Sequence, residues 1–324
     1  MRSSQTGNGW PMLMSDRIGS RMKLQDLHVL MTVAQAGSMG KAARILNTTQ
    51  PNVSRAIGDL EHALGVRLLD RHRQGVEPTE CGRALLSCGA AVFDDLRQGV
   101  KRIEFLADPT AGEVRIGSTA FLAASFVSAL IDRLSRRHPR IAFHLVTGYV
   151  EPLHRELTER RVDLLIVRSP GPNTDERLDF EFLFEDRYVV VAGAKNPWAR
   201  RRKIQISELA GESWVLPPAE SVIGSIIMKT FRASGLDYPR ATVVTDSPHM
   251  RVSLLETGRF ITFFPASALR FLSSGPALKI LAVDLPVARR PNGIVTLRDR
   301  ALSPVAQLLI NSARELAKPT AKRK

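Results

Sequence analysis

The sequence SMGKAARILNTTQPNVSRAIGDL, residues 38–60, decides how the N-terminal part of the chain folds. Gly37 can end a preceding helix in the left-handed conformation, and Ser38 can cap the helix that follows. Thr49 can cap a second helix that has Pro51 in its first turn, where the missing N–H costs nothing. The stretch therefore predicts two short helices joined by a tight turn.

The second of these helices has an apolar face and a polar face. Its apolar residues recur at three- and four-residue steps, so we expect them to point inward. These residues are Val53, Ala56, Ile57 and Leu60. The outward residues are of types that hydrogen-bond to base edges and phosphates in the major groove. We therefore predict a helix-turn-helix that contacts DNA through Gln50, Asn52, Ser54 and Arg55, with Pro51 shaping the helix start and making an apolar contact.

Two short strands are predicted directly after the helix-turn-helix. They cover Leu68–Arg71 and Gly75–Pro78, and their connection carries Arg71 and Arg73. A basic hairpin beside a helix-turn-helix is a wing, placed to touch phosphates or the minor groove. The alternative is a solvated loop. With a helix predicted over Leu24–Ala36, these elements form one small winged domain.

A long amphipathic helix is predicted over Glu80–Leu106. A helix of about 27 residues is about 40 Å long, and a small winged domain cannot bury an apolar stripe of that length. We therefore expect a second copy of the chain to cover it, forming a dimer through this linker helix. The stripe comprises Leu85, Cys88, Val92, Leu96, Val100 and Ile103.

Length and hydropathy set limits on the class of protein. A chain of 324 residues with 44% hydrophobic residues predicts two or three folding units with packed cores. No apolar run approaches the roughly 20 residues that span a bilayer, and the N-terminus lacks the apolar segment of a secretory signal. We therefore expect a cytoplasmic protein that has no membrane partner.

The net charge of +14 is not concentrated near the helix-turn-helix. Residues 1–110 contain fourteen Lys and Arg against eleven Asp and Glu, which leaves a net +3 in this part. Much of the rest lies in residues 200–203, RRRK, and in the basic tail, and such runs are more often solvated surface than binding sites. The charge permits DNA binding, so the prediction depends on the motif.

The chain shows no catalytic or metal-binding signature. Cys81 and Cys88 are its only cysteines. We interpret them as helix-face residues in a reducing compartment, with a redox pair or metal ligands as the alternative. The seven His residues lack zinc-ligand spacing, and no nucleophile elbow, Walker loop or dinucleotide fingerprint occurs. The sequence therefore predicts no metal, no cofactor and no enzymatic activity.

From Glu113 onward, short apolar runs alternate with amphipathic helices, which predicts an α/β domain with a mostly parallel sheet. The predicted strands are Val114–Gly117, Ala142–Val146, Leu164–Val167, Tyr188–Ala192, Trp214–Leu216, Thr242–Thr245, Phe260–Phe264, Ile280–Val283 and Gly293–Leu297. The predicted helices are Leu122–Arg137, Glu151–Arg160, Val222–Ser234, Met250–Glu256 and a C-terminal one around Pro304–Leu316.

The N-terminal segments resemble those of LysR-type transcriptional regulators, in the same order and spacing across about 65 residues. The C-terminal region is similar to the family's effector domain through VRIGSTA (114–120), ERRVDLLIVR (159–168) and GRFITFFPAS (258–267). The N-terminal segments are Leu24–Ala36, Lys41-Ala42-Ala43, Gln50-Pro51-Asn52-Val53-Ser54-Arg55-Ala56-Ile57, Leu68-Leu69-Asp70-Arg71 and Thr79-Glu80.

The resemblance implies an all-α winged helix-turn-helix domain, a linker helix, and an α/β effector domain of the periplasmic-binding-protein type (type 2) with two subdomains. It also implies a homotetramer that binds an interrupted palindrome in double-stranded promoter DNA, with RNA polymerase as a further partner. The expected boundaries are 1–22 disordered extension, 23–80 winged domain, 81–107 linker helix, 108–112 hinge, 113–318 effector domain (subdomain I 113–188 and 291–318, subdomain II 189–290) and 319–324 basic tail.

A ligand cleft between the two subdomains is the second predicted site. Ser118 and Thr119 follow a strand and lead into a helix, so free N–H groups and two hydroxyls can seat a carboxylate. The resemblance places an effector contact in this loop, and helix capping is the alternative. Arg168 can pair with an anionic effector or with a carboxylate neighbour. Weaker candidates are Thr147, Gly148, Pro218, Ser247 and Phe263.

Together these features predict a transcriptional regulator whose effector, a small anionic metabolite, alters subunit arrangement and DNA bending at target promoters. Two other classes stay open at this point. A solute-binding module would use the N-terminal helices only for assembly, and a small-molecule enzyme would need a catalytic constellation in the α/β part. The identity of the effector, the target genes and the direction of control are not encoded in any motif.

Overall fold

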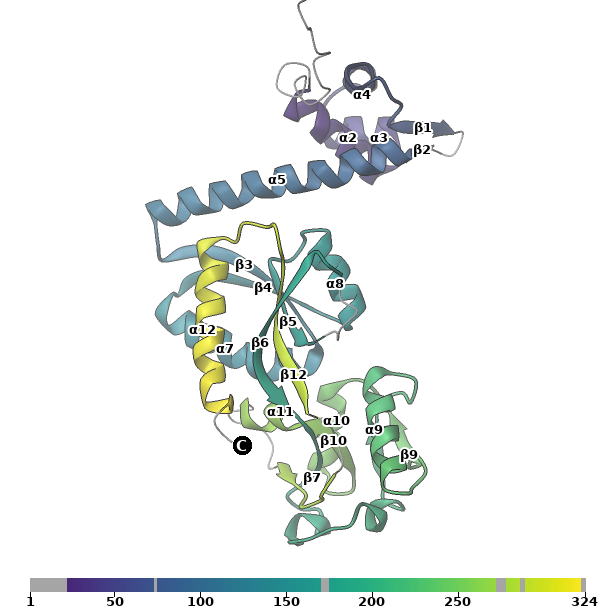
Figure 1. Cartoon of the computed structure of the whole chain (residues 1–324), viewed down its shortest axis with the longest axis vertical. Helices are drawn as coiled ribbons and strands as arrows, with labels where there is room; N and C mark the ends of the chain where they lie inside the picture. Colours follow the sequence, from purple (N-terminus) through teal and green to yellow (C-terminus); the bar gives the residue numbers. More distant parts are fainter. Residues whose placement is uncertain (1–21, 73–74, 170–174, 272–277, 286–288, 322–324) are drawn as a thin grey trace, which may run out of the picture. The chain divides into compact units, whose positions relative to one another are not determined.

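The computed structural model describes residues 22–72, 75–169, 175–271, 278–285 and 289–321. The chain divides into two compact units, Met1–Arg97 and Gln98–Lys324 (Figure 1). Arg73 and the predicted extension up to residue 21 lie outside the described residues. Within the described chain, no helix combines the length and the hydropathy that a bilayer crossing requires.

The first unit is the predicted winged helix-turn-helix. Gly37 and Gly65 end two of its helices in the left-handed conformation, with φ of 66° and 71°. Thr49 accepts a hydrogen bond from the Asn52 N–H at 3.4 Å, as predicted for a cap. In chain order the unit contains α2 (Leu24–Ala36), α3 (Met39–Ile45), α4 (Gln50–Leu64), β1 (Leu69–His72), β2 (Gly75–Pro78) and the start of α5 (Glu80–Ala107).

One predicted cap in this unit is not formed. Ser38 occupies the N-cap position of α3 with extended backbone, but its hydroxyl makes no capping hydrogen bond within the described chain. The nearby wing is held by the backbone instead, because the Val76 N–H donates to the Gly37 carbonyl oxygen at 3.0 Å. The predicted start of α3 is therefore right, although the expected side-chain contact is absent there.

The three helices of the first unit share one apolar core. Val53, Ile57 and Leu60 of α4 are fully buried, as predicted, and pack with Leu27 and Leu30 of α2. Burying a side chain of this size contributes about 1.5–3 kcal/mol relative to leaving it exposed. This packing fixes which face of α4 points outward.

The second unit contains two five-stranded sheets, and we call each sheet with its helices a lobe. The first lobe has strand order β4-β3-β5-β12-β6, and the second has order β11-β7-β10-β8-β9. The first-lobe strands are β3 (Ala111–Ser118), β4 (Arg140–Thr147), β5 (Leu164–Arg168), β6 (Leu178–Asp186) and β12 (Arg290–Leu297). The second-lobe strands are β7 (Tyr188–Gly193), β8 (Trp214–Leu216), β9 (Ala241–Val244), β10 (Ile261–Pro265) and β11 (Leu278–Ile280).

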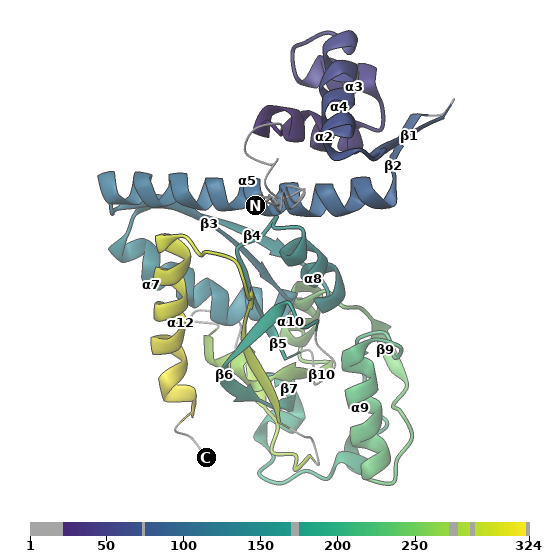
Figure 2. The same cartoon turned by 45° about the horizontal axis from the view of Figure 1, so that its top comes forward.

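Helices cover both faces of each sheet. In the first lobe, α7 and α12 pack on one face and α8 packs on the other (Figures 1 and 2). In the second lobe, α9 and α10 occupy opposite faces. The helical segments are α6 (Ala120–Leu122), the π-helix η2 (Ala123–Val127), α7 (Ser128–Arg137), α8 (Val150–Thr158), the 3-10 segments η3 (Pro197–Arg200) and η4 (Ile206–Leu209), α9 (Val222–Ala233), α10 (Pro248–Glu256), α11 (Ala266–Phe271) and α12 (Pro304–Ala321).

The sheets are mixed, which corrects the prediction of a mostly parallel sheet. In the first lobe β3 pairs in parallel with β4 and β5, whereas β12 runs antiparallel to β5 and β6. In the second lobe β8 pairs in parallel with β9 and β10, whereas β7 runs antiparallel to β10 and β11. The reversed strands are β7, along which the chain enters the second lobe, and β12, along which it returns to the first lobe.

The chain passes between the lobes at two places. Arg187 separates β6 from β7, so Tyr188, which the sequence analysis assigned to subdomain I, is the first residue of the second-lobe sheet. The return passage lies between Ile280 and Arg290. Strand β6 was not predicted, and α12 continues through Ala321 into the segment expected to be a basic tail. These differences leave the two-lobed architecture as predicted.

Candidate DNA-binding face and ligand cavity

The outward face of α4 carries the side chains predicted to contact DNA. Gln50, Asn52 and Arg55 are exposed and Ser54 is half-buried, on the side opposite the buried Val53. Pro51, also exposed, lies in the first turn of α4, as predicted. The Asn52 amide donates to the Thr48 hydroxyl oxygen at 3.2 Å, so this side chain also braces the turn before the helix.

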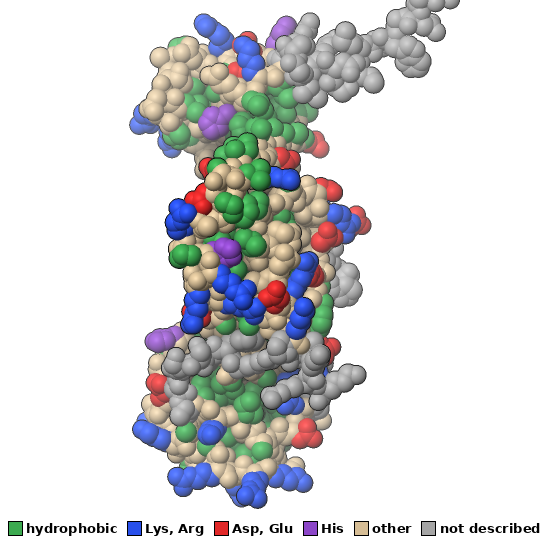
Figure 3. Space-filling view, turned by 90° about the vertical axis from the view of Figure 1, so that its left-hand side faces the viewer, with side chains coloured by type: hydrophobic (Ala, Val, Ile, Leu, Met, Phe, Trp, Pro, Cys, Tyr) green, Lys and Arg blue, Asp and Glu red, His purple; other side chains and the backbone are tan. Residues whose placement is uncertain are grey.

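Neither the wing nor the distribution of surface charge locates the DNA-binding face more closely. Arg71 is exposed on β1, where it is the register partner of Val76. Lys and Arg side chains are scattered over the face in Figure 3 and do not gather at one place on it. This distribution agrees with the sequence count, which places most of the positive surplus C-terminal to residue 110. Charge alone therefore does not locate the DNA-binding face.

The apolar stripe of α5 is partly covered near its beginning, where Cys88 is nevertheless exposed, and it is open at its end. Leu85 and Phe93 pack against the core of the first unit, and Phe93 lies 5.7 Å from the His28 ring. The later stripe residues, and Leu106 one turn beyond them, are from 49% to 74% exposed, a fraction unusual for large apolar side chains that repeat on one helix. These exposed residues are Leu96, Val100, Ile103 and Leu106.

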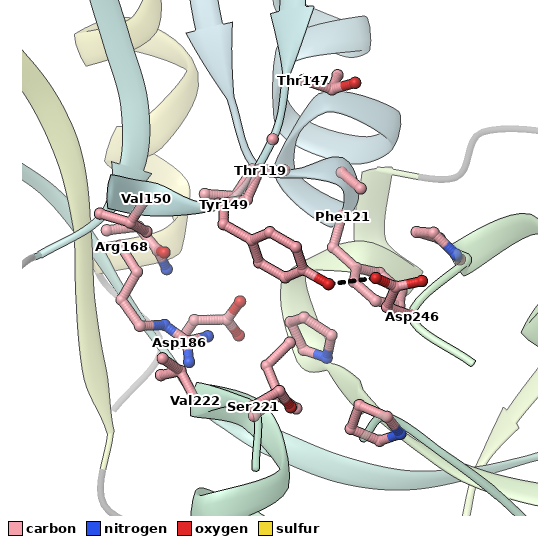
Figure 4. A pocket seen from close by; sticks show the side chains of 18 of the residues that line it. Thr119, Phe121, Thr147, Tyr149, Val150, Arg168, Asp186, Ser221, Val222 and Asp246 are labelled. Carbon is pink, nitrogen blue, oxygen red and sulfur yellow. Dashed lines mark hydrogen bonds between the residues drawn. The ribbon is translucent and has the colours of Figure 1, made fainter. Parts of the chain in front are cut away.

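A cavity of about 360 Å³ lies between the two lobes of the second unit (Figure 4). We call it the interlobe cavity. Its size is within the usual range for small-molecule sites, and both lobes contribute to its wall. Among the residues that the sequence analysis proposed for an effector site, the ones that line it are Thr119, Thr147, Gly148, Arg168 and Ser247.

Three proposed effector residues do not line the interlobe cavity. Ser118 is fully buried, and its hydroxyl donates to the Ile166 carbonyl oxygen at 2.7 Å, which ties β3 to β5. Phe263 lies in the core of the second lobe, stacked on Trp214 at 5.2 Å between ring centroids. Pro218 is not part of the cavity wall, although its neighbour Pro217 is. These three residues are corrections to the predicted lining, whereas the other five proposed residues reach the cavity wall.

The loop after β3 leads into a helix whose N-terminus faces the cavity. Thr119 is the N-cap residue of α6, and its side chain accepts no capping hydrogen bond within the described residues. The helix continues through a π-helical segment into α7, an irregularity that is frequent at functional sites. The N–H groups of the first turn therefore lie beside a hydroxyl that does not cap them, an arrangement suited to an anion.

The second lobe contributes a buried cation that the sequence analysis missed. Arg251 of α10 is 1% exposed, and its Nε and Nη2 donate to the Thr245 carbonyl oxygen at 3.1 and 2.9 Å. Its guanidinium carbon lies 5.4 Å from the centroid of the Phe121 ring in the first lobe. Burial lowers the pKa of Arg251 to about 10. Because this pKa is still well above neutral pH, the guanidinium stays charged there.

Two acidic side chains in the cavity wall are already hydrogen-bonded. Asp186 accepts from the Arg187 N–H at 2.9 Å, from the Ser267 N–H at 3.1 Å and from the Ser267 hydroxyl. Asp246 of the second lobe accepts from the Tyr149 hydroxyl of the first lobe, the dashed contact in Figure 4. That hydrogen bond raises the pKa of Tyr149. No local sequence pattern indicates the pairings of Asp186 with Ser267 and of Tyr149 with Asp246, because the partners are 81 and 97 residues apart in the chain.

An outward-facing helix of a winged helix-turn-helix, together with a two-lobed unit that encloses a small-molecule cavity, defines the class of ligand-binding transcriptional regulators. The comparisons agree with this class. The family model described as "Bacterial regulatory helix-turn-helix protein, lysR family" matches residues 24–83, and the one described as "LysR substrate binding domain" matches residues 107–318. The chain belongs to the LysR family of DNA-binding transcriptional regulators.

Several regulators are similar over almost the whole chain. The regulator GbpR of Azospirillum brasilense is 26% identical across 91% of this chain and 86% of its own length. The regulator TdcA of Escherichia coli K12 is 26% identical across 90% and 93%. A full-length structure of an OxyR variant from Pseudomonas aeruginosa has a TM-score of 0.66 at 21% identity, covering 94% and 99%, and CbnR has 0.58 at 18%, covering 91% and 99%.

These comparisons confirm the predicted family and fold class. Because the relatives are transcriptional regulators and the family does not consist of enzymes, they also decide between the classes that the sequence left open. The chain is neither a solute-binding module nor an enzyme.

Proposed function

We propose that this regulator reads promoter DNA through the outward face of α4. Gln50, Asn52, Ser54 and Arg55 would contact base edges and phosphates in the major groove, with Pro51 in apolar contact. Arg71 and, outside the described residues, Arg73 would contact the backbone or minor groove beside it. The observation that carries the proposal is the exposure of these polar side chains opposite the fully buried Val53, Ile57 and Leu60.

We further propose that the exposed stripe of α5 joins two chains, and that two such dimers form a homotetramer. Isolated surface Leu and Ile residues are common, but four on one helix face favour burial against an equal surface. A dimer would place two copies of α4 on two half-sites of an interrupted palindrome. In the cytoplasm, the assembly would act on transcription through RNA polymerase.

The effector proposed for the interlobe cavity is a small anionic metabolite. The open helix N-terminus after Thr119 and the arginines Arg168 and Arg251 support this choice. An effector held by both lobes would change how they close, and hence the arrangement of subunits and the bending of DNA. The change can be no larger than the difference in effector affinity between the two arrangements.

The replacement Arg55→Ala tests the DNA-binding proposal. Loss of one base contact should weaken binding by about 1–3 kcal/mol, or roughly 5- to 150-fold, without unfolding an exposed position. Fluorescence anisotropy on the DNA upstream of the chain's own gene measures the affinity, and circular dichroism checks the fold. Asp59→Asn, a change at another exposed position of α4, should not weaken binding. Unchanged affinity in Arg55→Ala would refute the assignment.

A further inference from the structure

The interlobe cavity contains buried hydrogen-bond donors that find no acceptor among the residues the structure describes. They are Nε of Arg168, Nδ2 of Asn292 and Nη1 of Arg251. Asn292 and Arg251 are each only 1% exposed, and all three residues line the same cavity. A buried donor left without an acceptor costs about 1–3 kcal/mol, so three of them in one cavity indicate that a ligand supplies the acceptors.

The three donors come from both lobes. Asn292 of β12 is the register partner of Arg168 of β5, so these two side chains lie on one face of the first-lobe sheet. Arg168 is held in place by Tyr188, whose ring centroid lies 4.8 Å from the guanidinium carbon. Arg251 comes from α10 of the second lobe and is anchored by the Thr245 carbonyl oxygen. The donors are therefore fixed before any ligand arrives.

The charge of the cavity wall limits how much negative charge a ligand can carry there. Its cationic side chains are Arg168 and Arg251, and its acidic side chains are Glu151, Asp186 and Asp246. Asp186 and Asp246 receive hydrogen bonds from within the protein, so they do not satisfy the open donors. Two anionic groups would add repulsion to an already acidic wall, whereas one carboxylate offers enough lone pairs for three donors.

Apolar side chains from both lobes form much of the remaining wall, beside hydroxyl groups such as those of Thr119, Ser221 and Ser247. Phe121 and Val150 belong to the first lobe, and Pro217, Val222 and Ile223 belong to the second. Phe121 also packs edge-on against Phe264 of the second lobe, with 5.0 Å between ring centroids. The apolar part of such a wall suits an aromatic or aliphatic ligand body.

We propose that the effector is a monocarboxylate with an apolar body, and that Arg251 is a specificity-determining residue that binds its carboxylate together with Arg168 and Asn292. The proposal rests on the proposed function and specifies the ligand class of that site. Because the carboxylate joins donors from both lobes, binding stabilises the closed arrangement of the lobes.

The test measures ligand binding to the full-length protein by thermal shift and isothermal calorimetry. The probes are benzoate, phenylacetate and hexanoate as monocarboxylates, with benzamide and terephthalate as the uncharged and doubly charged counterparts of benzoate. We expect at least one monocarboxylate to raise the melting temperature, and benzamide and terephthalate to bind at least tenfold more weakly than benzoate.

Two variants test the donors, and a third controls for charge. Arg251→Met removes the second-lobe donor and should weaken the monocarboxylate at least tenfold. Asn292→Asp keeps the side-chain shape but replaces the donor with a carboxylate, so it should abolish binding even if Arg251→Met is unstable. Arg259→Met removes an exposed arginine outside the cavity wall and should bind like the parent protein.

Three results would overturn the proposal. They are the absence of any shift with all three acids, equal binding of benzamide and benzoate, and parent-like binding by a folded Asn292→Asp protein. Each can be told apart from failure of the DNA-binding proposal, because retention of promoter DNA is measured with no acid present. A protein that binds DNA but none of these acids keeps its proposed function and loses this ligand assignment.

Discussion

Helix α4 and the interlobe cavity are both candidate binding sites, but they are built in different ways. The residues proposed to read DNA lie within one helix, and their exposure follows from the burial of Val53, Ile57 and Leu60 on the same helix. The cavity combines residues from separate strands, loops and helices between Thr119 and Asn292. Local periodicity is therefore enough to predict the first candidate site, whereas the second depends on how two lobes fold around it.

The prediction with the largest expected effect compares a change in the core of α4 with a change on its outward face. Ile57→Ala removes a fully buried side chain from the apolar core shared by α2, α3 and α4. It should lower the free energy of unfolding of the first unit by about 2–5 kcal/mol and remove DNA binding with it. Urea denaturation followed by circular dichroism measures the loss.

The conservative change Ile57→Val controls for this experiment and should cost only about 0.5–1.5 kcal/mol. The comparison between core and face fails if Arg55→Ala destabilises the protein as much as Ile57→Ala does. It would then be wrong to treat the outward face of α4 as separable from its core.

The next prediction tests whether the cavity depends on residues outside its wall. A Cβ atom at Gly193 of β7 would overlap the carbonyl oxygen of Leu255 on α10, the helix that carries Arg251. Gly193→Ala should therefore displace α10, lower the free energy of unfolding by about 1–3 kcal/mol and weaken benzoate binding. Denaturation and calorimetry measure the two effects.

Gly211→Ala is the matched control, because a Cβ there meets no atom within 4 Å. It should leave both stability and benzoate binding unchanged. If Gly193→Ala also leaves benzoate binding unchanged despite a loss of stability, the position of α10 does not govern the cavity.

The smallest expected effect concerns the contact between lobes at Tyr149. Tyr149→Phe removes the hydrogen bond to Asp246 on an exposed side chain, so it should cost less than about 1 kcal/mol at pH 8. Since folding raises the pKa of Tyr149, its contribution is complete below the ordinary pKa of about 10 and is lost as pH rises through the raised value.

The measurement is the difference in unfolding free energy between the parent protein and Tyr149→Phe, taken from pH 8 to above pH 10. This difference removes the effects of other groups that titrate in the same range. It should shrink as the pH rises. A difference that stays constant would mean that the phenol proton does not hold the lobes together.

Sequence patterns predicted elements whose causes are local. The left-handed Gly37 and the cap at Thr49 were predicted correctly because each depends on a few neighbouring residues. Strand β6 was missed because its outward positions carry acidic side chains. Asp179 and Glu181 pair with Arg298 and Arg314, which follow more than a hundred residues later. Acidic side chains whose partners are distant in the chain are typical of a loop when the sequence alone is considered.

The lining of the cavity was also hard to predict from the sequence, because it depends on contacts between distant segments. Ser118 and Thr119 are neighbours of similar chemistry after the same strand, and only Thr119 lines the cavity, because the strand pleat turns Ser118 into the sheet. Arg251 could not be predicted, since nothing in its helix indicates that its guanidinium is buried against Phe121 of the other lobe.

The sequence by itself determined the winged helix-turn-helix, the outward face of α4, the long helix and the alternating elements of a two-lobed effector domain. Periodicity and capping govern these features, and both act over a few residues. Only the tertiary structure decided which strand-end residues line the cavity and which donors remain open there. Those properties depend on burial and on partners supplied by distant segments, which no stretch of sequence contains.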